Sequence, residues 1–136
     1  EKALKAKKYL LKTAFKIHFL DFQNQTAMPG IYQSCDLFCL PSKSETWGLA
    51  VNEAMACGKA VLVSDQVGCA ADLILENENG ATFQSGNLAD LVQKLQQLCK
   101  HKLTLQQLGA ASSQKIQAWS FENSVKAIQQ KILEYA

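Results

Sequence analysis

The chain has 136 residues, of which 48% are hydrophobic and 19% charged, and its formal net charge is +2. This composition suits one globular domain with a substantial core and excludes a disordered tail. The nearly neutral balance argues against nucleic acid as the main partner, because the dense basic run lies in the first dozen residues. No apolar stretch approaches the ~20 residues of a membrane span, so no transmembrane segment is predicted.

The first part of the chain alternates between helical patterns and short apolar runs. Lysines spaced among Leu and Ala predict a helix over residues 2–12; its basic face is most simply solvated, and a membrane-surface or acidic-partner contact is the alternative. Residues 16–22 (KIHFLDF) are apolar and β-prone, which predicts a buried strand. A short helix follows, with Thr26 as its candidate N-cap. Its inward-facing residues are Met28, Ile31 and Tyr32.

Two further strands are expected in the middle of the chain. Residues 36–40 (DLFCL) predict a short strand buried on both faces, as in a parallel sheet, and Pro41 ends it. A helix over about 47–57 comes next, and Gly58 supplies its left-handed C-terminal residue. Residues 59–65 (KAVLVSD) predict another buried strand.

The second half of the chain is mostly helical. A turn at Asn79-Gly80 leads into a short strand. Strands that alternate with helices predict a parallel α/β sheet with right-handed crossovers, followed here by a helical tail. Because the chain opens at Glu1 inside an amphipathic pattern, we interpret it as a piece of a longer protein. The helices of the tail are expected near 87–100, 103–118 and 121–135.

The cysteine and histidine positions argue against a metal site. The five cysteines include no C-x-x-C pair, and neither His18 nor His101 lies beside a cysteine pair, so no bound metal is predicted. Cysteines within apolar runs favour reduced thiols and a cytosolic setting. The segment GKA at 58–60 is not a phosphate-binding loop, because Glu53 and Ala60 stand where glycine and a hydroxyl residue are needed. No G-x-G-x-x-G motif and no Ser-His-Asp arrangement occur either.

The loop at 41–48 joins the end of a predicted strand to the start of a helix. In an open parallel sheet, ligands bind beyond the carboxyl ends of the strands. Gly48 would let the backbone approach a ligand, and the N–H groups of Trp47, Gly48 and Leu49 would form an anion site suited to a diphosphate. A tight turn that simply needs glycine is the alternative. Gly68, after the next strand, marks a second such loop or an ordinary turn.

Glu45 and Glu53 flank the start of this helix, eight positions apart. A helix rises about 12 Å over eight residues. The carboxyl groups of glycosidases lie roughly 5–10 Å apart, so a hydrolase pair fits poorly. The spacing better suits one long ligand that is contacted at two ends. Taken singly, each glutamate is better explained as a surface or helix-terminus charge, and only the two together with the loop favour a ligand.

The segment PSKSETWGLAVNEAMACGKAVLVSD at 41–65 resembles the signature of group-1 (family 4) nucleotide-sugar glycosyltransferases with the GT-B fold. That signature has a Pro-Ser turn, a glutamate, an aromatic-Gly-Leu triplet and a second glutamate that opens an E-A-M-A-x-G run. The segments HFLDF and MPGIYQSCDLFCLPS agree with it, and the likeness covers roughly residues 10–130. The resemblance implies a Rossmann-like parallel sheet flanked by helices, as an incomplete C-terminal GT-B domain with a helical tail.

The resemblance also implies roles for the residues of the motif. Glu45 would contact the transferred sugar as the catalytic residue, and Glu53 would bind the ribose. The N–H groups of Trp47, Gly48 and Leu49 would face the sugar and the diphosphate. The donor would be a UDP- or GDP-sugar, the anomeric configuration would be retained, and neither a metal nor another cofactor would be needed. The acceptor would be a glycan, a lipid-linked molecule or a small molecule.

Residues 1–136 would then form a partial C-terminal, donor-binding domain of a larger enzyme. The acceptor-binding N-terminal domain, and the Arg and Lys that neutralise the diphosphate, would lie upstream, so this piece alone would transfer no sugar. The last helix would pack towards that domain and leave an apolar patch exposed here. The location would be cytoplasmic, with peripheral contact at the inner face of the membrane left open. The loop at 68–72 departs from the family's Gly-Gly-x-Pro-Glu, so no role carries over to it.

Two other functions remain open from the sequence. One is a nucleotide-binding module without catalysis, which Glu45 disfavours because a nucleotide alone needs only the Glu53 end of the site. The other is a phosphorylase or a nucleotide-sugar epimerase of the same architecture. An acceptor cleft in the rest of the protein would favour a transferase over both.

Overall fold

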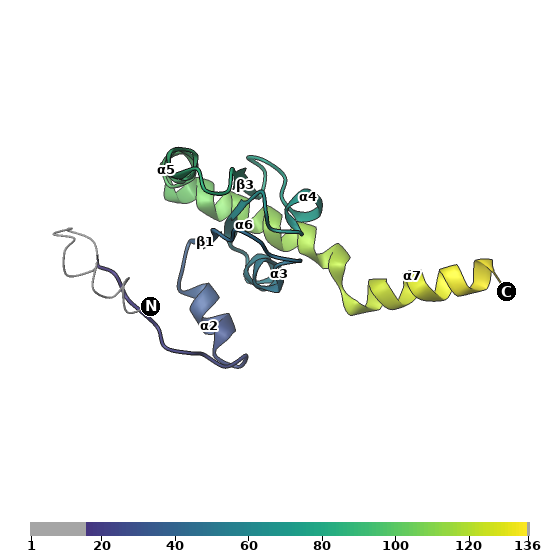
Figure 1. Ribbon diagram of the computed structural model, residues 1–136. Coiled ribbons are helices and arrows are strands. Elements are labelled where there is room, and N and C mark those ends of the chain that lie inside the picture. The colour runs from purple at the N-terminus through teal and green to yellow at the C-terminus, as the bar shows by residue number, and fades with distance from the viewer. Residues whose placement is uncertain (1–15, 136) are drawn as a thin grey trace.

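The computed structural model describes residues 16–135, and its centre is a small parallel sheet (Figure 1). Among these residues the sheet has three strands in the order β1-β2-β3, and both neighbouring pairs are parallel. Helices lie in the connections, which confirms the α/β class predicted from the alternating pattern. The strands are β1 (Leu37–Leu40), β2 (Ala60–Ser64) and β3 (Gly80–Phe83).

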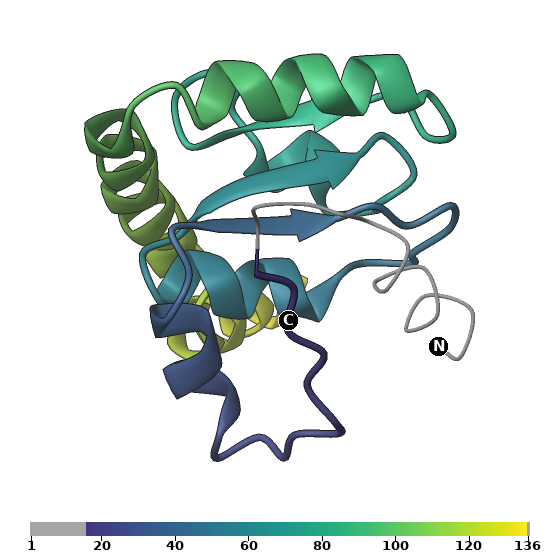
Figure 2. The ribbon, with the colours of Figure 1, turned by 90° about the vertical axis from the view of Figure 1, so that its left-hand side faces the viewer.

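Helices pack on both faces of this sheet (Figure 2). One helix connects β1 to β2, a single-turn helix connects β2 to β3, and the helical tail follows β3. The described helices are α2 (Met28–Gln33), α3 (Leu49–Ala56), α4 (Ala70–Leu73), α5 (Leu88–Leu98), α6 (Lys102–Ile116), the 3₁₀-helix η1 (Gln117–Trp119) and α7 (Phe121–Glu134).

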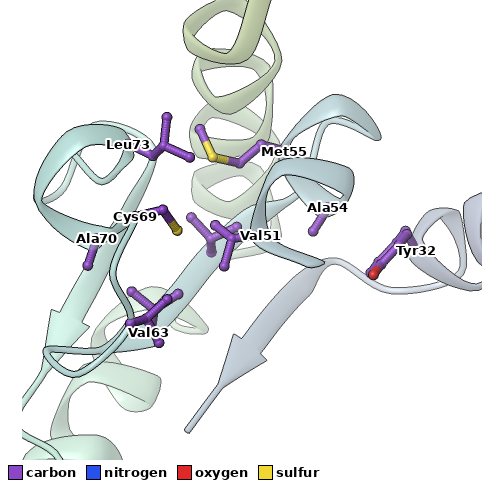
Figure 3. Close-up of a cluster of buried hydrophobic side chains, with 10 residues drawn as sticks. Tyr32, Val51, Ala54, Met55, Val63, Cys69, Ala70 and Leu73 are labelled. Carbon is purple, nitrogen blue, oxygen red and sulfur yellow. The ribbon is translucent and has the colours of Figure 1, made fainter. Parts of the chain in front are cut away.

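The side chains of β2 alternate between two hydrophobic cores, one on each face of the sheet. Val61 and Val63 belong to the first core, together with Met55 of α3 (Figure 3). Leu62 belongs to the second, where side chains of β3, α5 and α6 pack against it. The alternation follows because successive side chains of a strand point to opposite faces. Every residue of β2 is buried, which confirms the strand predicted at 59–65.

The burial of β1 differs from the prediction. The apolar run at 36–40 predicted burial on both faces, but all four residues of β1 are only half-buried. The reason is the position of the strand. β1 pairs with β2 on one side, and no described strand pairs with its other edge. A strand at the edge of a sheet keeps part of its surface open.

The strand predicted at 16–22 is absent. Residues 16–24 have no regular secondary structure, and the side chain of Phe22 is 95% exposed. A strand is stable only where a neighbour pairs with its backbone groups, and no described strand pairs with this segment. Its β propensity therefore did not decide its structure. The helix predicted at 2–12 lies outside the described residues.

Two predicted details of the turns are wrong. The residue at the N-cap of α2 is Ala27 rather than Thr26, and Asn24 closes this turn because its Oδ1 accepts from the Ala27 N–H. Before β3, the left-handed residue is Asn77, with φ 62°, whereas Gly80 already belongs to the strand. Asparagine tolerates this conformation, so the turn forms ahead of the Asn-Gly pair.

The helices of the tail match the prediction apart from small shifts at their ends. The side chain of Asn87 caps α5 by accepting from the Asp90 N–H at 3.1 Å. The side chain of Ser120 caps α7 in the same way, accepting from the Asn123 N–H at 3.2 Å. These caps satisfy backbone donors that a helix start leaves unpaired.

The last helix, α7, extends away from the rest of the molecule (Figure 1). None of its residues is buried, and the Phe121 side chain is 89% exposed. The exposed apolar patch predicted for this helix is therefore confirmed. Its members are Phe121, Val125, Ile128, Ile132 and Tyr135. Within residues 16–135, no helix combines the length and the apolar character that crossing a membrane requires.

Candidate functional site

The loop at 41–48 leaves the carboxyl end of β1 and is fixed to the ends of the other strands. Ser64, the last residue of β2, donates from its hydroxyl to the Ser42 carbonyl. Ser85, which follows β3, donates to the same carbonyl at 3.4 Å. These bonds hold the loop at the edge of the sheet where ligands bind in open parallel folds.

The same loop pairs with the loop that follows β2. The Glu45 N–H donates to the Gln66 carbonyl at 3.0 Å, and the Gly68 N–H donates to the Glu45 carbonyl at 2.9 Å. Together these bonds form an isolated parallel bridge between Glu45 and Val67. The two strand-end loops are therefore neighbours, as the parallel sheet predicted.

Two glycines allow this close pairing. A Cβ atom on Gly68 would lie 2.0 Å from the Thr46 carbonyl oxygen, and one on Gly48 would lie 2.9 Å from Cγ1 of Val67. Gly48 also has φ 100°, a conformation that residues with side chains rarely adopt. Packing of the loops thus requires both glycines. The approach of a ligand to Gly48 stays a prediction.

Cys69 lies buried beneath this pair of loops, with its Sγ 4.0 Å from the Gly48 carbonyl oxygen. Burial raises the pKa of its thiol, and the negative charges of Asp72 and Glu45 act in the same direction. A neutral, buried thiol is a poor nucleophile. Cys69 therefore fills space under the loops as a small apolar side chain.

Backbone donors at the start of α3 have no acceptor among residues 16–135. The helix begins at Leu49, with Gly48 at its N-cap. No residue of the described segment 16–135 accepts a hydrogen bond from the N–H of Gly48 or of Leu49. The Trp47 N–H lies 3.4 Å from Oε1 of Glu45, and its contact with a nucleotide-sugar donor stays a prediction. The Glu45 carboxylate thus sits at a helix N-terminus, where the helix dipole favours negative charge.

The indole of Trp47 is held from two sides. Its Nε1 donates to Oδ1 of Asn52 at 3.1 Å, and its ring lies against Trp119 with the centroids 5.2 Å apart. These contacts tie the loop at 41–48 both to α3 and to η1, which lies between α6 and α7 in the helical tail. Sequence reasoning missed the contact with Trp119, because no local pattern pairs Trp47 with a residue of the tail.

Glu53 lies on the exposed side of α3, about one turn after its start. Its Oε2 accepts a hydrogen bond from the Tyr32 hydroxyl at 2.8 Å. The sequence predicted that Tyr32 faces the core but not that its hydroxyl reaches Glu53. Because α3 begins only at Leu49, helix rise contributes about 6 Å to the spacing of Glu45 and Glu53, instead of the ~12 Å of a continuous helix.

Open depressions adjoin Glu53 on two sides. One, of about 220 Å³, lies against α2 and is lined by Tyr32 and Met28. Another, of about 510 Å³, lies against the end of α6 and is lined by Asn52 and Trp119. In the part of the chain that the structure describes, no three His, Cys, Asp or Glu side chains are grouped to hold a metal ion.

Paired loops and a helix N-terminus at the carboxyl edge of a parallel sheet are the architecture of nucleotide-binding α/β domains. The comparison with protein families is more specific: the family described as glycosyl transferases group 1 matches residues 1–115. The chain therefore belongs to the group 1 glycosyltransferases, as the resemblance of its motif predicted.

Individual proteins agree with this assignment. The sulfoquinovosyl transferase SQD2 of Arabidopsis thaliana is 35% identical over 71% of this chain, which spans 19% of that protein. Sucrose-phosphate synthase of Thermosynechococcus elongatus superposes with a TM-score of 0.82 at 20% identity, over 99% of this chain and 34% of its own. Anabaena HepE, solved in complex with UDP-glucose, superposes with a TM-score of 0.76 at 24% identity. The match covers 98% of this chain and 35% of HepE.

These structural neighbours show that the chain has the fold of part of a GT-B glycosyltransferase. The chain spans about a fifth to a quarter of the length of the first curated relatives that it matches.

Proposed function

We propose that this chain is the donor-binding part of a retaining glycosyltransferase that transfers a sugar from a UDP- or GDP-sugar to an acceptor. Family membership supports the reaction class, and the UDP-glucose in the Anabaena structure supports the donor class. The observation that carries the proposal is the arrangement at the start of α3. Glu45 lies there beside the N–H groups of Gly48 and Leu49, which have no acceptor within residues 16–135, and Glu53 follows one turn later.

The proposed roles follow the chemistry of each group. The N–H groups of Gly48 and Leu49 and the helix dipole bind the diphosphate. Glu45 accepts hydrogen bonds from hydroxyls of the transferred sugar, and Glu53 accepts them from the ribose. Trp47, in the loop at 41–48, holds the start of α3 in place through the contacts of its indole ring, and its backbone N–H is not assigned to the donor. Two N–H groups meet only part of the charge of a diphosphate, so cationic side chains outside this chain segment complete the site.

In the proposed reaction, the bond between the sugar C1 and the phosphate oxygen breaks while the acceptor oxygen bonds to C1. The leaving phosphate takes the proton of the acceptor hydroxyl. Departure and attack take place on one face of the sugar, so the anomeric configuration is retained. Glu45 stabilises the charge that develops on the sugar as the bond breaks.

The proposal gives residues 1–136 the place of a partial C-terminal domain, which works with an acceptor-binding domain of the same chain. The two together are called the complete protein below. This piece alone then transfers no sugar. Acceptors of the proposed enzyme are a glycan, a lipid-linked or a small molecule. We place the reaction in the cytoplasm, because all five cysteines are free thiols.

The two glutamates provide the test of this function. In the complete protein, Glu45→Gln should lower kcat while donor affinity is largely kept, because contacts that strengthen in the transition state govern kcat. Glu53→Gln should raise the donor KM with a smaller loss of kcat, because the ribose does not change during reaction. Each effect should exceed about tenfold, as expected for a lost hydrogen bond to a charged group. Steady-state kinetics and donor calorimetry measure both.

Glu78→Gln is the matched control, since Glu78 is an exposed glutamate in the turn before β3. It should change neither constant. If Glu53→Gln leaves donor affinity intact while Glu45→Gln abolishes it, the two ends are assigned the wrong way round and the proposal fails. A protein that binds the donor but transfers nothing, with or without Glu45, is the non-catalytic module instead.

A further inference from the structure

A buried tyrosine holds the exposed carboxylate of Glu53. Tyr32 is 4% exposed, and its ring packs edge-on against Phe38, with centroids 5.6 Å apart and planes at 75°. Its hydroxyl donates to Oε2 of Glu53 at 2.8 Å, across 21 positions of the sequence. The bond joins α2 to α3, at the rim of the depression between these helices.

The side chains of Tyr32 and Glu53 differ in conformational freedom. The core fixes the ring of Tyr32, which has two rotatable side-chain bonds, and with it the position of the hydroxyl (Figure 3). Glu53 lies on the surface and has three rotatable bonds, so without a partner its carboxylate samples several orientations. A fixed donor that bonds one carboxylate oxygen restricts the other oxygen to a narrow range of directions.

With this bond formed, the Glu53 carboxylate can still accept further hydrogen bonds. A carboxylate offers about four acceptor positions, of which Tyr32 uses one. No residue of the described segment bonds to Oε1 of Glu53. Burial raises the pKa of Tyr32 above its ordinary value, and the hydrogen bond and charge of Glu53 raise it further. The hydroxyl therefore keeps its proton and stays a donor throughout the neutral range.

We propose that Tyr32 is a positioning residue that presets the Glu53 carboxylate for the ribose hydroxyls, and that it thereby sets the preference of the site for ribonucleotides over 2′-deoxyribonucleotides. This inference rests on the proposed function, in which Glu53 binds the ribose. Preorganisation of this kind raises affinity because the ordering of the side chain has already taken place before the ligand arrives.

A purely structural role is the competing explanation. A buried tyrosine hydroxyl needs some partner, and Glu53 supplies one. In that case Tyr32→Phe would change the stability of the fold and leave nucleotide recognition as it was. The two explanations differ in one quantity, which is the ratio of affinities for a nucleotide and its 2′-deoxy form. That ratio is measured within one protein preparation, so the fraction of folded molecules does not affect it.

The experiment uses calorimetry on the complete protein with UDP and GDP, each compared with its 2′-deoxy counterpart. Tyr32→Phe keeps the ring and removes only the hydroxyl. It should lower the preference for the ribonucleotide about three- to tenfold, as the loss of ordering of one long side chain implies. With a saturating nucleotide-sugar donor, kcat should stay within about twofold, because the ribose is remote from the bond that breaks.

Two further variants complete the design. Tyr135→Phe makes the same chemical change on the exposed end of α7 and should leave the preference unchanged. Glu53→Gln should reduce the preference at least as much as Tyr32→Phe does. The double variant should lose no more than Glu53→Gln alone, because Tyr32 acts only through Glu53.

The outcomes separate the inference from the function on which it rests. If the wild-type protein binds neither nucleotide, both are overturned. If it binds them and Glu53→Gln lowers the preference while Tyr32→Phe does not, the inference alone is overturned. The inference alone is also overturned if Tyr32→Phe lowers the preference equally in the wild-type and the Glu53→Gln backgrounds. Tyr32 would then act without Glu53.

Discussion

At Gly68 the two strand-end loops approach so closely that no side chain fits between them, since a Cβ atom would lie 2.0 Å from the Thr46 carbonyl oxygen. Gly68→Ala should therefore push the loops apart and lower the free energy of unfolding by about 2–3 kcal/mol, at the upper end of the cost of overpacking. The shift also moves Glu45, whose carbonyl accepts from the Gly68 N–H, so donor binding should weaken as well. Urea unfolding and donor calorimetry measure the two effects.

Gly30→Ala is the control for this substitution. Gly30 lies inside α2, and no atom comes within 4 Å of the place where its Cβ would be. Alanine should stabilise the protein there by about 0.5–1 kcal/mol, because it favours the helix over the unfolded chain. Equal unfolding curves for wild type and Gly68→Ala would show that the loops are not packed as described.

The local part of the candidate site could be predicted from the sequence. Glu45 and Gly48 follow directly from a strand end, a turn and a helix start, which are patterns of neighbouring residues. The bond of Tyr32 to Glu53 and the contact of Trp47 with the tail could not be predicted. Both depend on the way helices from distant parts of the chain pack together, which no periodicity records.

At the scale of elements, the place of α6 depends on a second close approach. A Cβ atom on Gly109 would lie 2.1 Å from the Gly58 carbonyl oxygen, just after α3. Alanine normally favours a helix over glycine by about 1 kcal/mol. Here Gly109→Ala should instead destabilise the protein by about 1–3 kcal/mol, because α6 must move away from the turn that it covers. Urea unfolding of the single variant gives the sign of the change.

Ala110→Gly tests the helix preference alone, since Ala110 is exposed on the next position of α6. It should cost about 1 kcal/mol. A stabilised Gly109→Ala protein would mean that helix propensity outweighs the contact with Gly58, and the close packing of α6 on that turn would be wrong.

The elements that could be predicted are those whose signals are local. The apolar run of β2 and the capped helices of the tail lie close to their predicted bounds. The segment at 16–22 has an equally strong local signal but forms no strand, because pairing with a neighbour decides strand formation. β1 is only half-buried for a related reason, since no described strand covers its outer edge.

At the scale of the whole molecule, two surfaces are unusual for an isolated domain. No described strand pairs with the outer edge of β1, and α7 carries an exposed apolar patch along its length. Soluble monomers rarely expose connected apolar surface without a partner. Together with the small share of its relatives' length that the chain spans, these surfaces support the proposal that it works as one part of a larger enzyme.

The position of α7 leads to a prediction for this chain by itself. No residue of α7 is buried, so the helix adds little to either hydrophobic core. Deletion of residues 121–136 should leave the thermal unfolding midpoint within about 2 °C of the intact chain, because almost no apolar contact is lost. Binding of the dye ANS and concentration-dependent self-association should both fall, since the exposed apolar patch is removed.

A triple substitution of Val125, Ile128 and Ile132 by glutamine serves as the control, because it keeps the helix and removes its apolar face. It should reproduce the lower dye binding with the same unfolding midpoint. In the complete protein both changes should lower the midpoint, since α7 is proposed to pack there against the acceptor domain and burial of its face then contributes to stability. A deletion that lowers the midpoint of the isolated chain by more than about 5 °C would place α7 in the core of its own domain. If deletion of α7 changes the unfolding midpoint equally in the isolated chain and in the complete protein, α7 does not pack between domains. Only a face that another domain covers would add stability in the complete protein alone.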